Sequence, residues 1–218
     1  MSGHGGAAAR IAADLRDAIL HGEYEPGDRV RQEQLAEHHG ASRVPVREAL
    51  RMLEAEGLVT LVANTGAWVS RLSQEECDEL YRMREQIEPL LLRYNVPLLG
   101  AEVLDELDEL ATRMASEQEV EQFLRDDRRF HALSYGAART SVLGSTVEQL
   151  WNRTQHYRRA FLRLSDPSAD RGIHLEHRLL VESLRRGDAD EAGAVLGIHV
   201  RRTRLELAKH PEVFAAAR

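Results

Sequence analysis

Four side chains in the second half of the sequence have the types and spacing to bind one metal ion. Asp127 and His131 lie one helical turn apart within an apolar stripe, and His177 and His199 lie on the apolar faces of two later segments. Three imidazoles and one carboxylate suit Zn²⁺ or another divalent transition metal, with coordination positions left for water or a ligand. For any one of these histidines alone, a hydrogen-bonded core position is the simpler interpretation, so the metal site is predicted from all four together.

Three arginines could bind an anion from a single helix face. Arg43, Arg47 and Arg51 are spaced by four, and the first two fall near the beginning of a predicted helix, where the helix dipole disfavours cations. An external polyanion would explain them, because the planar donor fork of arginine grips a phosphate or the O6 and N7 atoms of guanine. We therefore predict contact with double-stranded DNA, and a solvated basic face is the alternative.

The overall charge requires this contact to be local. The net charge of the chain is −7, and residues 1–72 contain eight arginines, no lysine and ten acids. Since affinity for DNA comes largely from cations that meet phosphates, a globally acidic segment can bind only through a concentrated basic patch.

Length and composition predict two folded domains, at residues 1–72 and 73–218. The chain has 218 residues, of which 43% are hydrophobic and 30% are charged. The single cysteine, Cys77, cannot form an intrachain disulfide, which fits a reducing cytoplasm. The N-terminus lacks the apolar run of a signal peptide and no stretch is long and apolar enough for a membrane helix, so we expect a cytoplasmic protein without membrane contact.

The elements that must position the arginines form a winged helix-turn-helix pattern. Helical periodicity, turn residues and alternation predict helices over 7–21, 32–39 and 43–56, then strands over 58–62 and 67–70. Gly40 is placed to end the second helix and Ser42 to cap the third. A hairpin directly after two helices joined by a short turn is a wing, whereas two helices alone would also fit a generic helical hairpin.

Residues 73–218 are predicted to be helical throughout and to form an antiparallel bundle. The expected helices span residues 74–95, 101–115, 117–136, 141–164, 169–186 and 189–209. Each has an apolar stripe, so the predicted fold is mainly α, with about six helices in the second domain. Ligand and metal sites in such bundles lie between facing helices.

The stretch LAEHHGASRVPVREALRMLEAEGLV, followed by NTGAWV, resembles the N-terminal domain of the GntR family of transcription regulators. The resemblance implies that Arg43 and Arg47 contact bases or phosphates in the major groove and that the wing tip at Gly66 approaches the minor groove. It adds Ser42 and Val44, which flank these arginines, and the wing residues Asn64 and Thr65, while Arg51 is a candidate through its spacing alone. Many relatives have arginine where this chain has Thr65, so weaker wing contacts are expected. Such regulators usually bind near-palindromic operators as homodimers.

The segments RMREQIE, DRRFH and EHRLLVESLRRGDADEAGAVLGIH resemble the FCD effector-binding domain of the FadR branch of that family. The expected number of helices places the chain nearer the VanR-like subgroup. In metal-binding members an Asp-x3-His pair and two later histidines hold the metal, and the resemblance assigns these roles to Asp127, His131, His177 and His199.

A metal ion with open positions could anchor a small carboxylate effector, because an anionic oxygen can replace bound water. Arg84 could bind the same anion, although an ion pair with Glu88, four residues later, is an equal alternative. Arg153 and Arg158 are further anion-binding candidates, and the alternative for both is exposure to solvent.

These features favour a ligand-responsive transcriptional regulator, expected to be a repressor, over an enzyme. A metal-sensing regulator is the first alternative, although it leaves the open coordination positions without a purpose. A metalloenzyme is a distant third, because only Glu176 is available as a general base and the winged domain would be unexplained.

Overall fold

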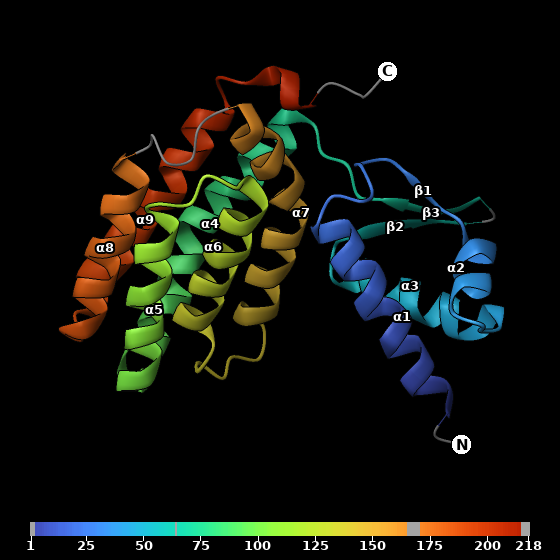
Figure 1. Ribbon diagram of the computed structural model, residues 1–218, viewed down its shortest axis with the longest axis horizontal. Helices are drawn as coiled ribbons and strands as arrows, with labels where there is room; N and C mark the ends of the chain where they lie inside the picture. The colour runs from blue at the N-terminus through green and yellow to red at the C-terminus, as the bar shows by residue number, and fades with distance from the viewer. Residues whose placement is uncertain (1–2, 64, 165–170, 215–218) are drawn as a thin grey trace. The chain divides into compact units, whose positions relative to one another are not determined.

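The computed structural model describes residues 3–63, 65–164 and 171–214. Two compact units are present, one made of residues 1–73 with 148–156 and the other of residues 74–147 with 157–218 (Figure 1). Each unit has its own arrangement of elements, and the helix α7, Leu143–Leu164, contributes residues to both.

Three helices form the body of the N-terminal unit: α1 (Gly3–Leu20), α2 (Gln32–His38) and α3 (Arg43–Ala55). The helix α1 packs against α3, and its Ile11 and Leu15 are buried together with Val46 and Leu53 of α3. Apolar residues at three-to-four spacing put these side chains on one face of each helix, so burying both faces stabilises the pair. Gly40 follows α2 with φ +56°, a left-handed conformation that glycine adopts readily.

A small antiparallel sheet completes this unit. Its strands are β1 (Arg29–Val30), β2 (Val59–Val62) and β3 (Gly66–Val69), in the order β1-β3-β2. Val62 pairs with Gly66 and Val59 with Val69, so β2 and β3 form the predicted wing. Because Arg29 pairs with Trp68, the wing is also hydrogen-bonded to the short strand that precedes α2.

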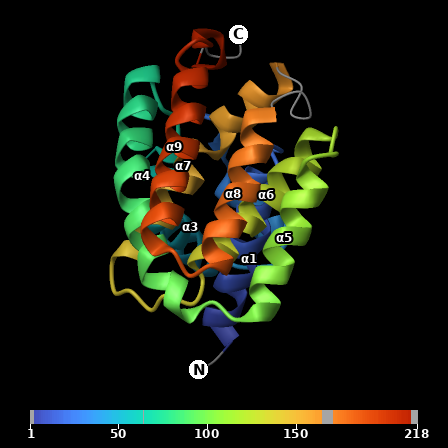
Figure 2. The ribbon, with the colours of Figure 1, turned by 90° about the vertical axis from the view of Figure 1, so that its left-hand side faces the viewer.

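The C-terminal unit is a helical bundle, as predicted. Its further elements are α4 (Gln74–Asn95), η1 (Val96–Leu98), α5 (Ala101–Met114), α6 (Val120–Tyr135), α8 (Arg171–Arg185), α9 (Ala189–Leu207) and η3 (Pro211–Phe214). Figure 2 shows α4, α9, α8 and α5 running alongside one another, with α4 packed on α9, α9 on α8, and α8 on α5. Together with α7 these make six α-helices in the described part of residues 74–214. The mainly helical fold class is confirmed.

Two predicted helices begin later than expected: α7, expected from residue 141, begins at Leu143, and α6 begins three residues after its expected start. The helix expected over 117–136 begins at Val120, because the Glu117 carboxylate accepts hydrogen bonds from the backbone N–H groups of Gln118 and Glu119 at 2.9 and 2.8 Å. This local turn uses the N–H groups before the helix starts. Residues 169–170, where another helix was expected to begin, lie outside the described residues. None of the described helices has the length and apolar character needed to cross a membrane.

Candidate nucleic-acid interface and metal centre

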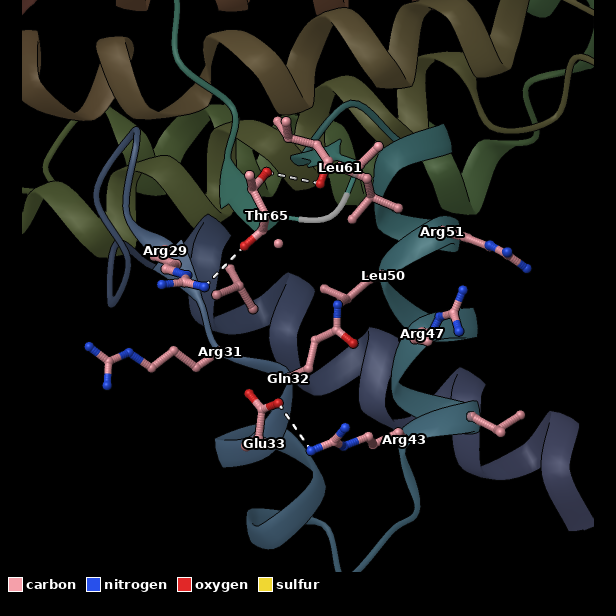
Figure 3. A pocket seen from close by; sticks show the side chains of 15 residues that line it. Arg29, Arg31, Gln32, Glu33, Arg43, Arg47, Leu50, Arg51, Leu61 and Thr65 are labelled. Atoms are coloured by element: carbon pink, nitrogen blue, oxygen red, sulfur yellow. Dashed lines mark hydrogen bonds and ion pairs between the residues drawn. The ribbon is translucent and has the colours of Figure 1, made fainter.

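The exposed face of α3 forms one wall of a groove in the N-terminal unit. Arg43, Arg47 and Arg51 lie on this face, while Ala49 and Leu53 on the opposite face are buried. Figure 3 shows the three arginines along α3, at one side of a groove of about 900 Å³. The helix therefore anchors itself by its apolar side and presents guanidinium groups on the other, as the spacing by four predicted.

The wing forms another part of the groove, and its tip is fixed by hydrogen bonds. The Thr65 carbonyl accepts a hydrogen bond from Arg29 Nη2 at 3.0 Å, and the Thr65 hydroxyl donates to the Val62 carbonyl at 3.0 Å. Gly66 has φ +139°, a backbone conformation that other residues rarely adopt. The predicted DNA contact Asn64 lies outside the described residues.

Two arginines of the groove were missed by the sequence-based prediction. Arg29 of β1 and Arg31, just before α2, both line the groove and are exposed. Figure 3 shows them on the side opposite α3. The alternation in Arg29-Val30-Arg31, with Val30 buried, could have indicated that both cations face solvent. Five arginines thus line one groove of a unit whose sequence is mildly acidic.

The groove arginines are available to an external anion. Arg51 pairs with Glu48 at 2.8 Å and Arg43 lies 3.5 Å from Glu33, and all four side chains are more than half exposed. Exposed pairs of this kind contribute at most about 1 kcal/mol, so exchanging the carboxylate for a phosphate costs little. Arg47 forms no ion pair with any described residue. Ser42 lies at the N-cap position of α3, as predicted, but its side chain forms no capping hydrogen bond. Val44, in the first turn, is 60% exposed.

In the C-terminal unit the structure brings Asp127, His131, His177 and His199 together. Their potential ligand atoms all lie within 4.8 Å of one another, and the four residues are 0%, 2%, 1% and 4% exposed. The helices α6, α8 and α9 supply them. His177 Nε2 lies 3.4 Å from Asp127 Oδ1, and His177 Nδ1 has no hydrogen-bond partner among the described residues. A buried imidazole with so little hydrogen bonding fits a metal-ligand role.

Burial favours the neutral form of two of these imidazoles, His131 and His177. It lowers the pKa of His177 to about 4 and that of His131 well below 6.5, and the neighbouring histidines and Arg158 add to the effect. Burial alone raises the pKa of the Asp127 carboxyl, but Arg158 and His131 outweigh it and hold that pKa well below 3.8. Near neutral pH His131 and His177 therefore offer lone pairs and Asp127 a negative charge, which are the forms that bind a metal.

Arg158 lies against this cluster. Its Nη2 donates to Asp127 Oδ1 at 2.7 Å and its Nη1 donates to Oδ2, and the residue is only 5% exposed. The solvent-exposed alternative is thereby wrong for Arg158. The other predicted anion-binding residue of α7, Arg153, lies five residues earlier, on another face of the helix, and is not brought to the cluster.

Arg84 forms the ion pair that the sequence offered as an alternative. Its Nε donates to Glu88 Oε1 at 2.6 Å, and the two residues are 3% and 0% exposed. Tyr135 donates its hydroxyl proton to the other oxygen of Glu88 at 2.7 Å, a contact that was not predicted. An effector contact at Arg84 stays a prediction.

Two family models match the chain along most of its length. Residues 7–69 match the bacterial regulatory proteins of the gntR family, and residues 79–202 match the FCD domain. The first match contains the arginine groove, and the second contains all four cluster residues.

Individual relatives are similar across both units. The chain is 28% identical over 182 residues to the uncharacterized HTH-type transcriptional regulator YdhC of Bacillus subtilis (strain 168), covering 82% of this chain and 80% of the relative. It is 30% identical over 211 residues to an uncharacterized HTH-type transcriptional regulator in an unstable DNA locus of Streptomyces ambofaciens, covering 94% and 88%. Among solved structures, Escherichia coli McbR/YncC matches with a TM-score of 0.81 at 25% identity, covering 94% and 98%.

Proposed function

The chain belongs to the gntR family of bacterial regulatory proteins and contains an FCD domain, and on this basis we propose that it represses transcription as a cytoplasmic homodimer controlled by a small carboxylate. Membership of the family makes it a DNA-binding transcriptional regulator and not an enzyme. Repression is the direction we infer, because an operator-bound dimer covers DNA that the transcription machinery needs.

The arginine-lined groove of the N-terminal unit carries the proposal. Arg43, Arg47 and Arg51 of α3 line this groove, and α3 is the second helix of the helix-turn-helix. In that role the N-terminal part of the helix meets base edges in the major groove of DNA. We assign base or phosphate contacts to Arg43 and Arg47, with Ser42 and Val44 beside them, and minor-groove contact to the wing at Thr65 and Gly66.

Two copies are needed for useful affinity. A single small reading head covers a few base pairs, and the sequence of the N-terminal segment is mildly acidic, so one head would bind weakly and with strong salt dependence. A two-fold dimer would place two heads on the half-sites of a near-palindrome. We propose residues 1–72 as the DNA-binding domain and 73–218 as the effector-binding domain.

We further propose that the Asp127, His131, His177 and His199 cluster holds a divalent transition metal, with Zn²⁺ as the first choice. The donor set, the neutral imidazoles of His131 and His177 and the ionised Asp127 carboxylate fit such an ion. A bound ion would supply a Lewis-acid site for an anionic oxygen of the effector. The nearby guanidinium of Arg158 would contribute a second anion-binding group.

The operator role is tested by DNA binding of the double variant Arg43→Ala/Arg47→Ala. Each lost base contact costs about 1–3 kcal/mol, so the affinity for DNA from the upstream region of the gene should fall by at least tenfold. The matched control is Arg82→Ala/Arg129→Ala, which removes two exposed arginines of the C-terminal unit. Equal affinities of the two double variants would contradict the proposed interface.

The metal and effector roles need two further measurements. Elemental analysis of protein purified without chelator should find about one transition metal per chain, and His177→Ala should lose it. Operator binding is then titrated with a panel of carboxylates at fixed metal concentration. A response to one carboxylate supports the proposal, whereas a flat response with a clear dependence on metal would favour a metal sensor.

A further inference from the structure

A chain of buried polar groups leads away from His131 on the side opposite the cluster. His131 Nδ1 lies 3.3 Å from the Tyr135 hydroxyl, which is 2.7 Å from Glu88 Oε2, and Glu88 Oε1 is 2.6 Å from Arg84 Nε. These four residues are at most 8% exposed. The chain connects α6 to α4, and only His131 of its members belongs to the cluster.

The chemistry of the groups fixes the direction of each hydrogen bond. Arg84 can only donate, and the two Glu88 carboxylate oxygens accept from Arg84 Nε and from the Tyr135 hydroxyl, so the single proton of Tyr135 goes to Glu88. The Tyr135 oxygen then accepts from His131, so His131 carries its proton on Nδ1.

The same logic applies to a second histidine of the cluster. His199 Nδ1 lies 3.2 Å from Glu176 Oε2, and Glu176 Oε1 accepts from Arg202 Nε at 2.7 Å. The carboxylate accepts on both sides, so His199 also carries its proton on Nδ1. In two histidines from different helices, Nε2 is therefore the unprotonated nitrogen, the one that can bind a metal.

We propose that Arg84, Glu88 and Tyr135 are positioning residues that hold His131 in the Nδ1–H tautomer, so that Nε2 is its metal-binding atom. This proposal rests on the proposed metal site and adds to it three residues that do not touch the ion. Hydrogen bonds to the ring nitrogen that does not bind the metal fix the tautomer and ring orientation of metal-binding histidines. In this role Arg84 acts by orienting the Glu88 carboxylate.

Glu88→Gln is the sharpest test, because it reverses the chain of hydrogen bonds without changing the size of the side chain. Arg84 still needs an acceptor, so the oxygen of the new side-chain amide would turn toward it and the amide N–H₂ toward Tyr135. The Tyr135 oxygen would then accept from the amide and donate its proton to His131 Nδ1. The proton of His131 would move to Nε2, and the cluster would lose one ligand.

The direct readout is the tautomer of His131, measured by two-bond ¹H–¹⁵N correlation spectra of the full-length protein in chelator. We expect Nδ1–H in the wild-type protein and Nε2–H in Glu88→Gln. An Nε2–H tautomer in the wild-type protein, or an unchanged tautomer in Glu88→Gln, would overturn the proposal. Because this measurement needs no metal, it stays informative if the metal site itself proves wrong.

The second readout is zinc affinity, measured by competition with a chromophoric chelator. Tyr135→Phe removes one hydroxyl and should weaken zinc binding by about 10–100-fold, as the loss of an outer hydrogen bond does at other metal sites. Tyr81→Phe is the matched control, since Tyr81 is 1% exposed and its hydroxyl has no hydrogen-bond partner among the described residues. Equal zinc affinities of the two variants would contradict the positioning role, whereas a wild-type protein that binds no zinc would contradict the metal site.

Discussion

Replacing Arg158 by methionine should destabilise the C-terminal unit and at the same time strengthen its response to zinc. The guanidinium of Arg158 occupies both oxygens of Asp127, and the two side chains are 5% and 0% exposed. In Arg158→Met the Asp127 carboxylate stays buried, and its nearest remaining partners are His177 Nε2 at 3.4 Å and His131 Nε2 at 3.8 Å. A buried charge without its partner is costly, and a metal ion at the same carboxylate would supply the missing positive charge.

The magnitude follows from the burial of the pair. Removing one partner of a buried ion pair costs about 3–5 kcal/mol. At about 2–4 °C per kcal/mol for a chain of this size, Tm in chelator should fall by roughly 10 °C. Saturating zinc should raise the Tm of Arg158→Met by several degrees more than that of the wild-type protein, because no guanidinium then competes for Asp127.

Differential scanning fluorimetry with chelator and with saturating zinc measures both effects. Arg159→Met is the matched control, because Arg159 is the next residue of α7, is 2% exposed and pairs with Glu121, which is not part of the cluster. It should lose stability but gain the wild-type increment from zinc. If zinc raises Tm equally in all three proteins, Arg158 and the metal do not compete for Asp127, and the reasoning fails.

Two further predictions follow. Arg31→Ala should weaken DNA binding several-fold and reduce the slope of log K against log salt by about 0.9, since Arg31 is an exposed cation at the edge of the groove and would bind a phosphate. Fluorescence anisotropy at several salt concentrations measures this, and an unchanged slope would show that Arg31 does not contact DNA. In chelator, the free energy of unfolding should fall as pH drops from 6.5 to 4. The pKa of His177 is about 4 in the folded protein and 6.5 in the unfolded chain, so the unfolded chain binds the proton first and is favoured as pH falls. The loss from His177 approaches about 3 kcal/mol; urea unfolding at several pH values measures it, and a wild-type slope in His177→Gln would contradict the assignment.

The helices and the wing could be predicted from the sequence because their signals are local. The third helix was expected over 43–56 and spans Arg43–Ala55, since its apolar stripe and flanking turn residues are contained in the segment itself. The sequence also indicated the four cluster residues, because each interrupts an apolar face with a polar side chain. The late start of α6 at Val120 escaped prediction, because it depends on the side-chain conformation of Glu117.

Partners that are distant in the sequence could not be predicted. Arg158 meets Asp127 across 31 residues, and Tyr135 meets Glu88 across 47, so each contact depends on how two helices pack. One partner of the Tyr135–Glu88 contact had a local signal, because Tyr135 follows His131 by four residues and continues the series of polar residues on α6. Which acid it would reach depended on the neighbouring helix α4.

The depth of the Asp127, His131, His177 and His199 cluster also determines how quickly an ion could be exchanged. With all four residues at most 4% exposed, an ion seated among them could leave only when α6, α8 and α9 separate locally. Its residence time would then be set by the frequency of that opening, and it would persist through many cycles of operator binding and release. Such an ion would behave as a permanently bound component of the protein. The regulatory signal would then come from a ligand that exchanges faster.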